Sequence, residues 1–179
     1  MREFNRTQMI AMSSVLAAVY AVVTVFAPVP QYQALQLRFA DCLEVLAFFI
    51  GWPGVLGLSL GCFVANVLSP YGLLDMLLGT FSTVVSTMTV MYVGRNSSVK
   101  NFEGNLLISM GVSSIIMGVM IGYLLSFYGE IFGIAAAAVT LSQVVAKVVI
   151  GYPIGLSLPK FMPGVFHVKG LEVEMRRTE

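Results

Sequence analysis

The chain has 179 residues, of which 58% are hydrophobic and 11% are charged, and its formal net charge is +1. A soluble domain carries about 25% charged residues, so this composition excludes a soluble domain of useful size and indicates one integral membrane domain. The near-neutral net charge argues against a nucleic-acid partner. One histidine and two cysteines, with both cysteines in apolar stretches, argue against a metal site and a disulfide framework.

Apolar runs separated by turn residues predict six membrane-spanning helices, since a helix needs about 20 residues to cross the hydrocarbon core. The first run has that length, and we expect it to be retained as a span and not cleaved as a signal peptide. The second and third runs are short and meet at Gly51, Trp52 and Pro53; a single broken span over 39–68 would reduce the count to five. The six predicted helices are 8–28, 39–51, 53–68, 73–94, 104–126 and 130–158.

The positions of Lys and Arg predict the orientation, because cytoplasmic loops carry an excess of these residues. With six helices, the basic residues of the N-terminus, the 95–103 loop and the C-terminal tail all fall on one side. The predicted fold is therefore an all-α bundle of six transmembrane helices with both termini in the cytoplasm. The tail, residues 160–179, mixes positive and negative charges and is expected to fray.

The stretch QLRFADCLEVLAFF, residues 36–49, places Arg38, Asp41 and Glu44 three residues apart in an apolar segment. Residues at this spacing lie on one face of a helix. One interpretation is an Arg38–Asp41 ion pair at the water interface, with Glu44 reaching outward. The other is a functional site, because a charged side chain at the centre of a membrane helix costs about 2.5 kcal/mol or more and is rare without a use.

Further polar residues are expected near this stripe. Asn66 lies near the outer end of the third predicted helix, and Asp75 opens the fourth, where a carboxylate also suits the helix dipole. Gln143 and Lys147 lie four residues apart on the sixth predicted helix. A buried ammonium group needs a counter-charge, and Glu44 is a candidate partner for Lys147.

These residues predict an outward-facing pocket, in which Tyr32 is the aromatic side chain best placed to stack on a ligand. Carboxylates and an amide suit a flat heterocycle with several N–H donors. A guanine-like edge presents a ring N–H and an amino group side by side, and one carboxylate can accept both hydrogen bonds. A desolvated site of this kind also rejects analogues that lack the donors, because its acceptor would stay unpaired.

Small residues recur every four positions on the first predicted helix, at Ser13, Ala17 and Ala21. Such spacing lets two helix backbones approach closely. The stripe lies near the cytoplasmic end, where a partner helix can dock. Glycine pairs with the same spacing are expected instead to pack within the chain, at 57 and 61, 118 and 122, and 151 and 155.

The run LQLRFADCLEVLAFF, followed by WPGVLGLSLGCFVANVLSPYGLLDMLLGTFSTVVS, resembles the QueT family. Members of this family are predicted substrate-binding subunits of energy-coupling factor (ECF) transporters, assigned to queuosine precursors. The resemblance covers residues 9–94 well and the remainder mainly by hydropathy. Four residues match the family pattern: Arg38, Asn66, Asp75 and Gly79. Three depart from it, since Asp41, Glu44 and Ala47 stand where the family often has Glu, Thr and Pro.

The resemblance implies a substrate-binding subunit in the plasma membrane that binds a 7-deazaguanine such as preQ1, preQ0 or queuine. It implies two kinds of partner, an ECF transmembrane coupling subunit, onto which the small-residue stripe docks, and two ATPase subunits. The subunit would topple in the bilayer to release its solute. The chain itself would be no enzyme and would need no cofactor, because it lacks the G-x-x-x-x-G-K-[ST] phosphate loop and its partners hydrolyse the ATP.

Three other functions stay open. The first is an ECF subunit for another vitamin-like solute. The second is a small membrane enzyme that uses Asp41, Glu44 and Asp75 as acid/base groups or as Mg²⁺ ligands. The third is a scaffold, for which neutralising Asp41 and Glu44 would stabilise the protein and leave transport intact.

Overall fold

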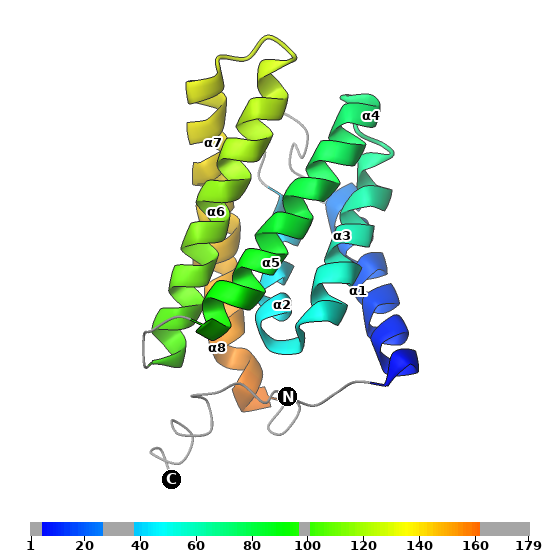
Figure 1. The fold of residues 1–179 in the computed structure, drawn as a ribbon, viewed down its shortest axis with the longest axis vertical. Coiled ribbons are helices and arrows are strands. Elements are labelled where there is room, and N and C mark those ends of the chain that lie inside the picture. The colour runs from blue at the N-terminus through cyan, green and yellow to red at the C-terminus, as the bar shows by residue number, and fades with distance from the viewer. Residues whose placement is uncertain (1–4, 27–37, 97–100, 162–179) are drawn as a thin grey trace.

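The computed structural model describes residues 5–26, 38–96 and 101–161, which are almost entirely helical and contain no strand (Figure 1). The elements are the α-helices α1 (Arg6–Phe26), α2 (Val45–Ile50), α3 (Trp52–Asn66), α4 (Gly72–Leu74), α5 (Thr80–Asn96), α6 (Phe102–Ser126), α7 (Phe132–Val144) and α8 (Tyr152–Phe161). Three irregular helices join them: the 3₁₀ helix η1 (Phe39–Glu44) and the π-helices η2 (Asp75–Gly79) and η3 (Val145–Gly151).

Four helical segments are long and apolar enough to cross a membrane, namely Arg6–Phe26, Gly72–Gly94, Phe102–Ser126 and Phe132–Lys160. Large hydrophobic side chains are exposed along α1, α3, α5, α6 and α7. Apolar surface of this extent is typical of a protein whose outside faces lipid. The all-helical membrane class is thus confirmed, while six crossings and the cytoplasmic location of both termini stay predictions.

The chain reverses direction at Gly51, between α2 and α3 (Figure 1). Gly51 has a φ of 71°, a conformation that is open to glycine because it has no Cβ. Residues 39–68 therefore form two antiparallel segments and not one broken span. The first segment, η1 with α2, has six residues in each part. At about 2.0 and 1.5 Å per residue it is about 20 Å long, shorter than the hydrocarbon core of about 30 Å.

Helix backbones come into close contact at the glycine pairs. A Cβ on Gly57 would lie 2.7 Å from the Ser13 carbonyl oxygen, and one on Gly61 would lie 2.7 Å from that of Ala17. The second pair, Gly118 and Gly122, lies equally close to α7. The prediction that the glycine pairs pack inside the chain is confirmed.

The small-residue stripe of α1 lies in the first of these contacts. Ala17 is only 8% exposed, and Ser13 and Ala21 are half-buried. A partner helix has no access to Ala17 in this structure, because Gly61 of α3 already packs against it. Ala17 is covered because α3 carries glycine at the contact, and glycine lacks the side chain that would otherwise keep α1 at a distance.

Candidate functional site

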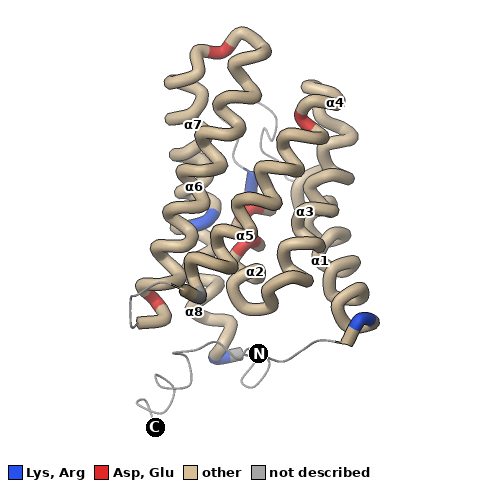
Figure 2. The backbone as a smooth tube through the Cα atoms, viewed as in Figure 1, with Lys and Arg blue, Asp and Glu red and all other residues tan. Residues whose placement is uncertain are grey.

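Among the described residues, five charged side chains are buried in the bundle interior. Asp41, Glu44 and Lys147 are 0% exposed, Arg38 is 4% exposed and Asp75 is 5% exposed. Figure 2 shows charged positions within the body of the bundle as well as at its ends. Four of the five lie in irregular helices, two in the 3₁₀ helix η1 and one in each π-helix. Irregular helical turns inside longer helical segments are frequent at functional sites.

The 3₁₀ geometry of η1 separates Arg38 from the other two residues of the predicted stripe, Asp41 and Glu44. Side chains three residues apart eclipse each other in a 3₁₀ helix, so Asp41 and Glu44 share one face. Arg38 stands just before η1, with an extended backbone (φ −81°, ψ 96°), and its guanidinium points to other partners. Glu44 does not reach outward to water, since it is fully buried, and that interpretation of the stripe is wrong.

Arg38 belongs to a group of polar contacts that we call the Arg38 cluster: Arg38, Cys62, Asn66, Ser69 and Asp75. The guanidinium donates to Asn66 Oδ1 and lies 3.7 Å from Cys62 Sγ. Asn66 Nδ2 in turn donates to the Asp75 carbonyl oxygen at 3.1 Å, and Ser69 Oγ donates to Asp75 Oδ2 at 2.5 Å. The cluster thus connects the start of η1 with α3 and η2.

The absence of a side chain at Gly79 leaves the space that Asn66 and Asp75 of the Arg38 cluster occupy. A Cβ at this position would lie 2.6 Å from Asn66 Nδ2 and 2.9 Å from Asp75 Oδ1, closer than real Cβ contacts. The four residues that match the family pattern, Arg38, Asn66, Asp75 and Gly79, therefore lie in one place. Asp75 is a member of a contact network and not only a carboxylate near a helix start.

Asp41 is held by two donors from distant helices. Tyr20 Oη of α1 donates to Asp41 Oδ1 at 2.6 Å, and Gln143 Nε2 of α7 donates to Asp41 Oδ2 at 2.5 Å. Both donors are buried, with exposed fractions of 0% and 2%. The sequence reasoning missed Tyr20. The available signal was a lone tyrosine in an Ala- and Val-rich helix, because a buried tyrosine hydroxyl usually needs a partner.

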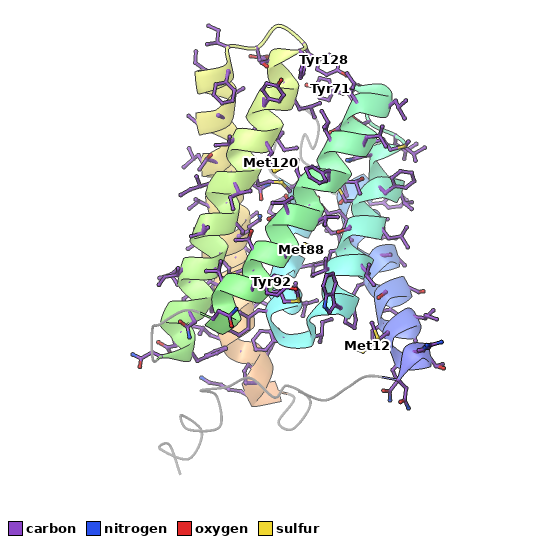
Figure 3. All side chains as sticks on the ribbon, in the orientation of Figure 1. Met12, Tyr71, Met88, Tyr92, Met120 and Tyr128 are labelled. Carbon is purple, nitrogen blue, oxygen red and sulfur yellow. The ribbon has the colours of Figure 1, made fainter. Side chains whose placement is uncertain are left out.

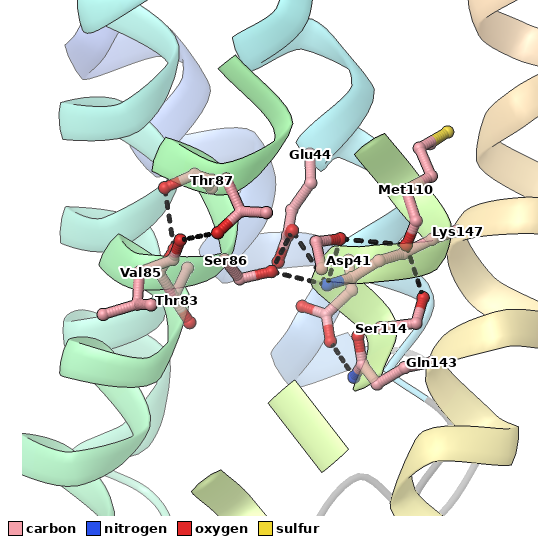
Figure 4. Close-up of polar contacts among 12 residues, drawn as sticks. Asp41, Glu44, Thr83, Val85, Ser86, Thr87, Met110, Ser114, Gln143 and Lys147 are labelled. Atoms are coloured by element: carbon pink, nitrogen blue, oxygen red, sulfur yellow. Dashed lines mark hydrogen bonds and ion pairs between the residues drawn. The ribbon is translucent and has the colours of Figure 1, made fainter. Parts of the chain in front are cut away.

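Lys147 and Glu44 form a buried ion pair, with 2.9 Å between Nζ and Oε2 (Figure 4). Ser86 Oγ donates to the same Oε2 at 2.6 Å. Lys147 also donates to Ser86 Oγ at 2.6 Å and to Ser113 Oγ at 3.3 Å, so all three ammonium hydrogens have acceptors. Glu44 as the partner of Lys147 is confirmed, whereas the serines of α5 and α6 carried no signal in the sequence.

Several buried polar side-chain atoms of the described residues lack a hydrogen-bond partner, and two of them are acceptors in this site: Glu44 Oε1 and Gln143 Oε1. An unsatisfied buried polar atom costs about 1–3 kcal/mol, and native proteins contain few of them. Both atoms belong to residues whose other polar atom is engaged, by Lys147 and Ser86 in one case and by Asp41 in the other. The two oxygens are thus held in place and are free to accept hydrogens from a bound molecule.

Two aromatic residues, Tyr71 and Tyr128, lie together near the upper end of the bundle as drawn in Figure 3. Tyr128 Oη donates to the Tyr71 carbonyl oxygen at 2.6 Å, and the two ring centroids are 4.8 Å apart. Partial burial raises the pKa of Tyr71 above its ordinary value of 10.0, and the carboxylates of Asp75 and Glu130 add to the shift. The hydroxyl of Tyr71 therefore stays neutral. Tyr32, the predicted stacking residue, lies outside the described residues, and its role stays a prediction.

The carboxylates Asp41, Glu44 and Asp75 have separate partners, and no group of three His, Cys, Asp or Glu side chains in 5–26, 38–96 and 101–161 is placed to hold a metal ion. An apolar helical bundle built around buried charges defines a polytopic membrane protein, in which such charges mark a functional site by default.

A model of the QueT transporter family matches residues 10–160, which is most of the chain. The chain therefore belongs to the QueT transporter family, as the sequence resemblance predicted, and the protein is a membrane transporter. Comparisons with curated proteins and with solved structures gave no significant match.

Proposed function

We propose that this transporter is the substrate-binding subunit of an ECF importer in the plasma membrane, and that its substrate is a 7-deazaguanine such as preQ1, preQ0 or queuine. The observation that carries the proposal is the pair of buried acceptors without partners, Glu44 Oε1 and Gln143 Oε1. A transporter interior with spare acceptors suits a solute that brings hydrogen-bond donors.

The chemistry of a deazaguanine meets this requirement. Its pyrimidine edge presents a ring N–H and an amino group, and both are donors. Charge-assisted hydrogen bonds to a carboxylate are about twice as strong as neutral ones, and the low dielectric constant of a water-free site strengthens each of them. The seven described residues of the predicted binding set lie buried in the interior: Arg38, Asp41, Glu44, Asn66, Asp75, Gln143 and Lys147.

Import needs partners, because the described chain is a bundle of helices with no phosphate loop in its sequence. In the proposed function an ECF transmembrane coupling subunit binds this chain, two ATPase subunits supply the energy, and the chain topples in the bilayer to release the solute. The contact face on α1 is then the exposed one and not the stripe that α3 covers. Small exposed residues on that face are Ala11, Ser14 and Ala18, which lie three and four positions apart.

The test is equilibrium binding to the purified chain in detergent, after any bound endogenous ligand has been removed. The panel contains preQ1, preQ0, queuine, guanine, riboflavin, thiamine and biotin. Nanomolar binding of one deazaguanine, with guanine much weaker, is the expected result. Tight binding of another vitamin would support the importer function but exclude a deazaguanine as the substrate. Binding of no compound in the panel would overturn the proposed function.

A further inference from the structure

The orientation of the Gln143 amide is fixed by its neighbour. Gln143 Nε2 donates to Asp41 Oδ2 at 2.5 Å, inside the bundle, where Gln143 is only 2% exposed. An ionised carboxylate accepts hydrogen bonds and donates none. In this bond the amino end of the amide faces Asp41, and the oxygen Oε1 faces away from it.

Asp41 is itself held from the opposite side. Tyr20 Oη donates to Asp41 Oδ1 at 2.6 Å and is fully buried on α1. The hydroxyl occupies one carboxylate oxygen and leaves the other for the Gln143 amide. Tyr20, Asp41 and Gln143 thus form a chain of hydrogen bonds from α1 through η1 to α7, and its last atom is the unpartnered Gln143 Oε1.

The second unpartnered acceptor lies in the same region. Asp41 and Glu44 share a face of η1, and their partners Gln143 and Lys147 are four residues apart on the last long helical segment. Figure 4 shows the four side chains side by side. Lys147 and Ser86 hold Glu44 Oε2, so Oε1 is the oxygen left over.

We propose that Glu44 Oε1 and Gln143 Oε1 accept polar hydrogens from one edge of the ligand, and that Asp41 and Tyr20 are positioning residues that hold the Gln143 amide in its accepting orientation. This inference rests on the proposed function and deepens it, because it states what the site selects. The ligand class is a molecule with at least two N–H donors on one edge. A molecule with an acceptor opposite Glu44 Oε1 or Gln143 Oε1 would place its lone pair against the lone pair of that oxygen and would be rejected.

The experiment compares preQ1 with the same compound lacking its 2-amino group, by equilibrium binding in detergent. Wild type is expected to prefer preQ1 by about tenfold or more, because the analogue leaves one buried acceptor unpaired. Gln143→Met keeps the length of the side chain and removes the acceptor that is assigned to the 2-amino group, while Glu44 Oε1 takes the ring N–H, so the preference should fall to about threefold or less. Ser142→Ala, at the neighbouring position of α7, is the matched control and should keep the wild-type preference.

The positioning residues have a separate readout. Asp41→Asn offers Gln143 both a donor and an acceptor, so the amide can turn over and the preference for preQ1 should fall. Tyr20→Phe removes only a hydroxyl, and it should weaken preQ1 more than the analogue. If Gln143→Met does not fold, Tyr20→Phe tests the same acceptor.

Failure of this inference differs from failure of the proposed function. If wild type binds none of the panel, the proposed function falls and this inference falls with it. If wild type binds preQ1 without preference over the analogue, or if folded Gln143→Met and Tyr20→Phe keep the full preference, the acceptor assignment is overturned and the proposed function stands.

Discussion

Replacing Glu44 by glutamine tests the site with a change of one atom and one charge. Ser86 and Lys147 both donate to Glu44 Oε2, at 2.6 and 2.9 Å. In Glu44→Gln these two donors require the amide oxygen at the position of Oε2, so the amide NH₂ replaces the unpartnered Oε1. The substitution therefore turns the proposed ligand acceptor into a donor, and the new donor would face a donor of the ligand.

The size of the effect follows from the bond that is lost. A hydrogen bond to a charged group contributes about 1.5–3 kcal/mol, which corresponds to about tenfold to 100-fold in Kd. We expect Glu44→Gln to bind preQ1 weaker by at least this factor, measured by titration calorimetry on the purified protein in detergent. An unchanged Kd in a folded Glu44→Gln protein would refute the assignment of Glu44 Oε1 to the ligand.

The same substitution leaves Lys147 without its counter-charge. Breaking one half of a buried ion pair costs about 3–5 kcal/mol, so the thermal midpoint of unfolding should also fall. The double variant Glu44→Gln/Lys147→Met removes the uncompensated ammonium and should recover most of the midpoint. Loss of stability that the double variant does not recover would mean that Glu44 stabilises the fold by another route.

Three further predictions concern the Arg38 cluster, the α1 face and the ligand. Gly79→Ala places a Cβ 2.6 Å from Asn66 Nδ2, and the strain should cost about 1–3 kcal/mol of stability and weaken ligand binding. Gly133→Ala is the control: a Cβ there meets nothing within 4 Å, so stability and ligand binding should stay unchanged. Ala18→Trp, on the exposed face of α1, should block uptake in cells without changing ligand affinity, and normal uptake would remove this face as the docking surface. Ala137→Trp, at an exposed position of α7, is its control and should transport normally. Saturating preQ1 should raise the unfolding midpoint of wild type, since a ligand of the native state stabilises it by mass action, and no shift would argue against specific binding.

The sequence was sufficient for features that depend on local pattern or on charge balance. Apolar runs and turn residues predicted the membrane class, and the glycine spacing predicted close helix contacts within the chain. The Lys147–Glu44 pair was predictable because a buried ammonium requires a counter-charge, and few carboxylates were available in the apolar segments.

Other features depend on tertiary structure and left no local signal. The sequence pattern does not distinguish an α-helix from the 3₁₀ turn that separates Arg38 from the face of Asp41 and Glu44. Ser86 and Ser113 resemble any other small residues of a membrane helix until Lys147 lies against them. The stripe on α1 was visible, but whether a stripe of small residues faces α3 or the outside is decided by Gly57 and Gly61, far along the chain.

The hydrogen bond between Asp41 and Gln143 joins residues 102 positions apart, and the ion pair of Glu44 is made with the same late segment. During synthesis both carboxylates reach the membrane long before their partners exist. A chain that stops before α7 leaves Asp41 with Tyr20 and Glu44 with Ser86, but without the Gln143 amide and the Lys147 ammonium. A charged side chain at the centre of a membrane helix costs about 2.5 kcal/mol or more, and in such a chain the Glu44 carboxylate has lost its counter-charge. The polar interior thus makes completion of the last segment a condition for a stable protein, and it exposes truncated chains to quality-control proteases in the membrane.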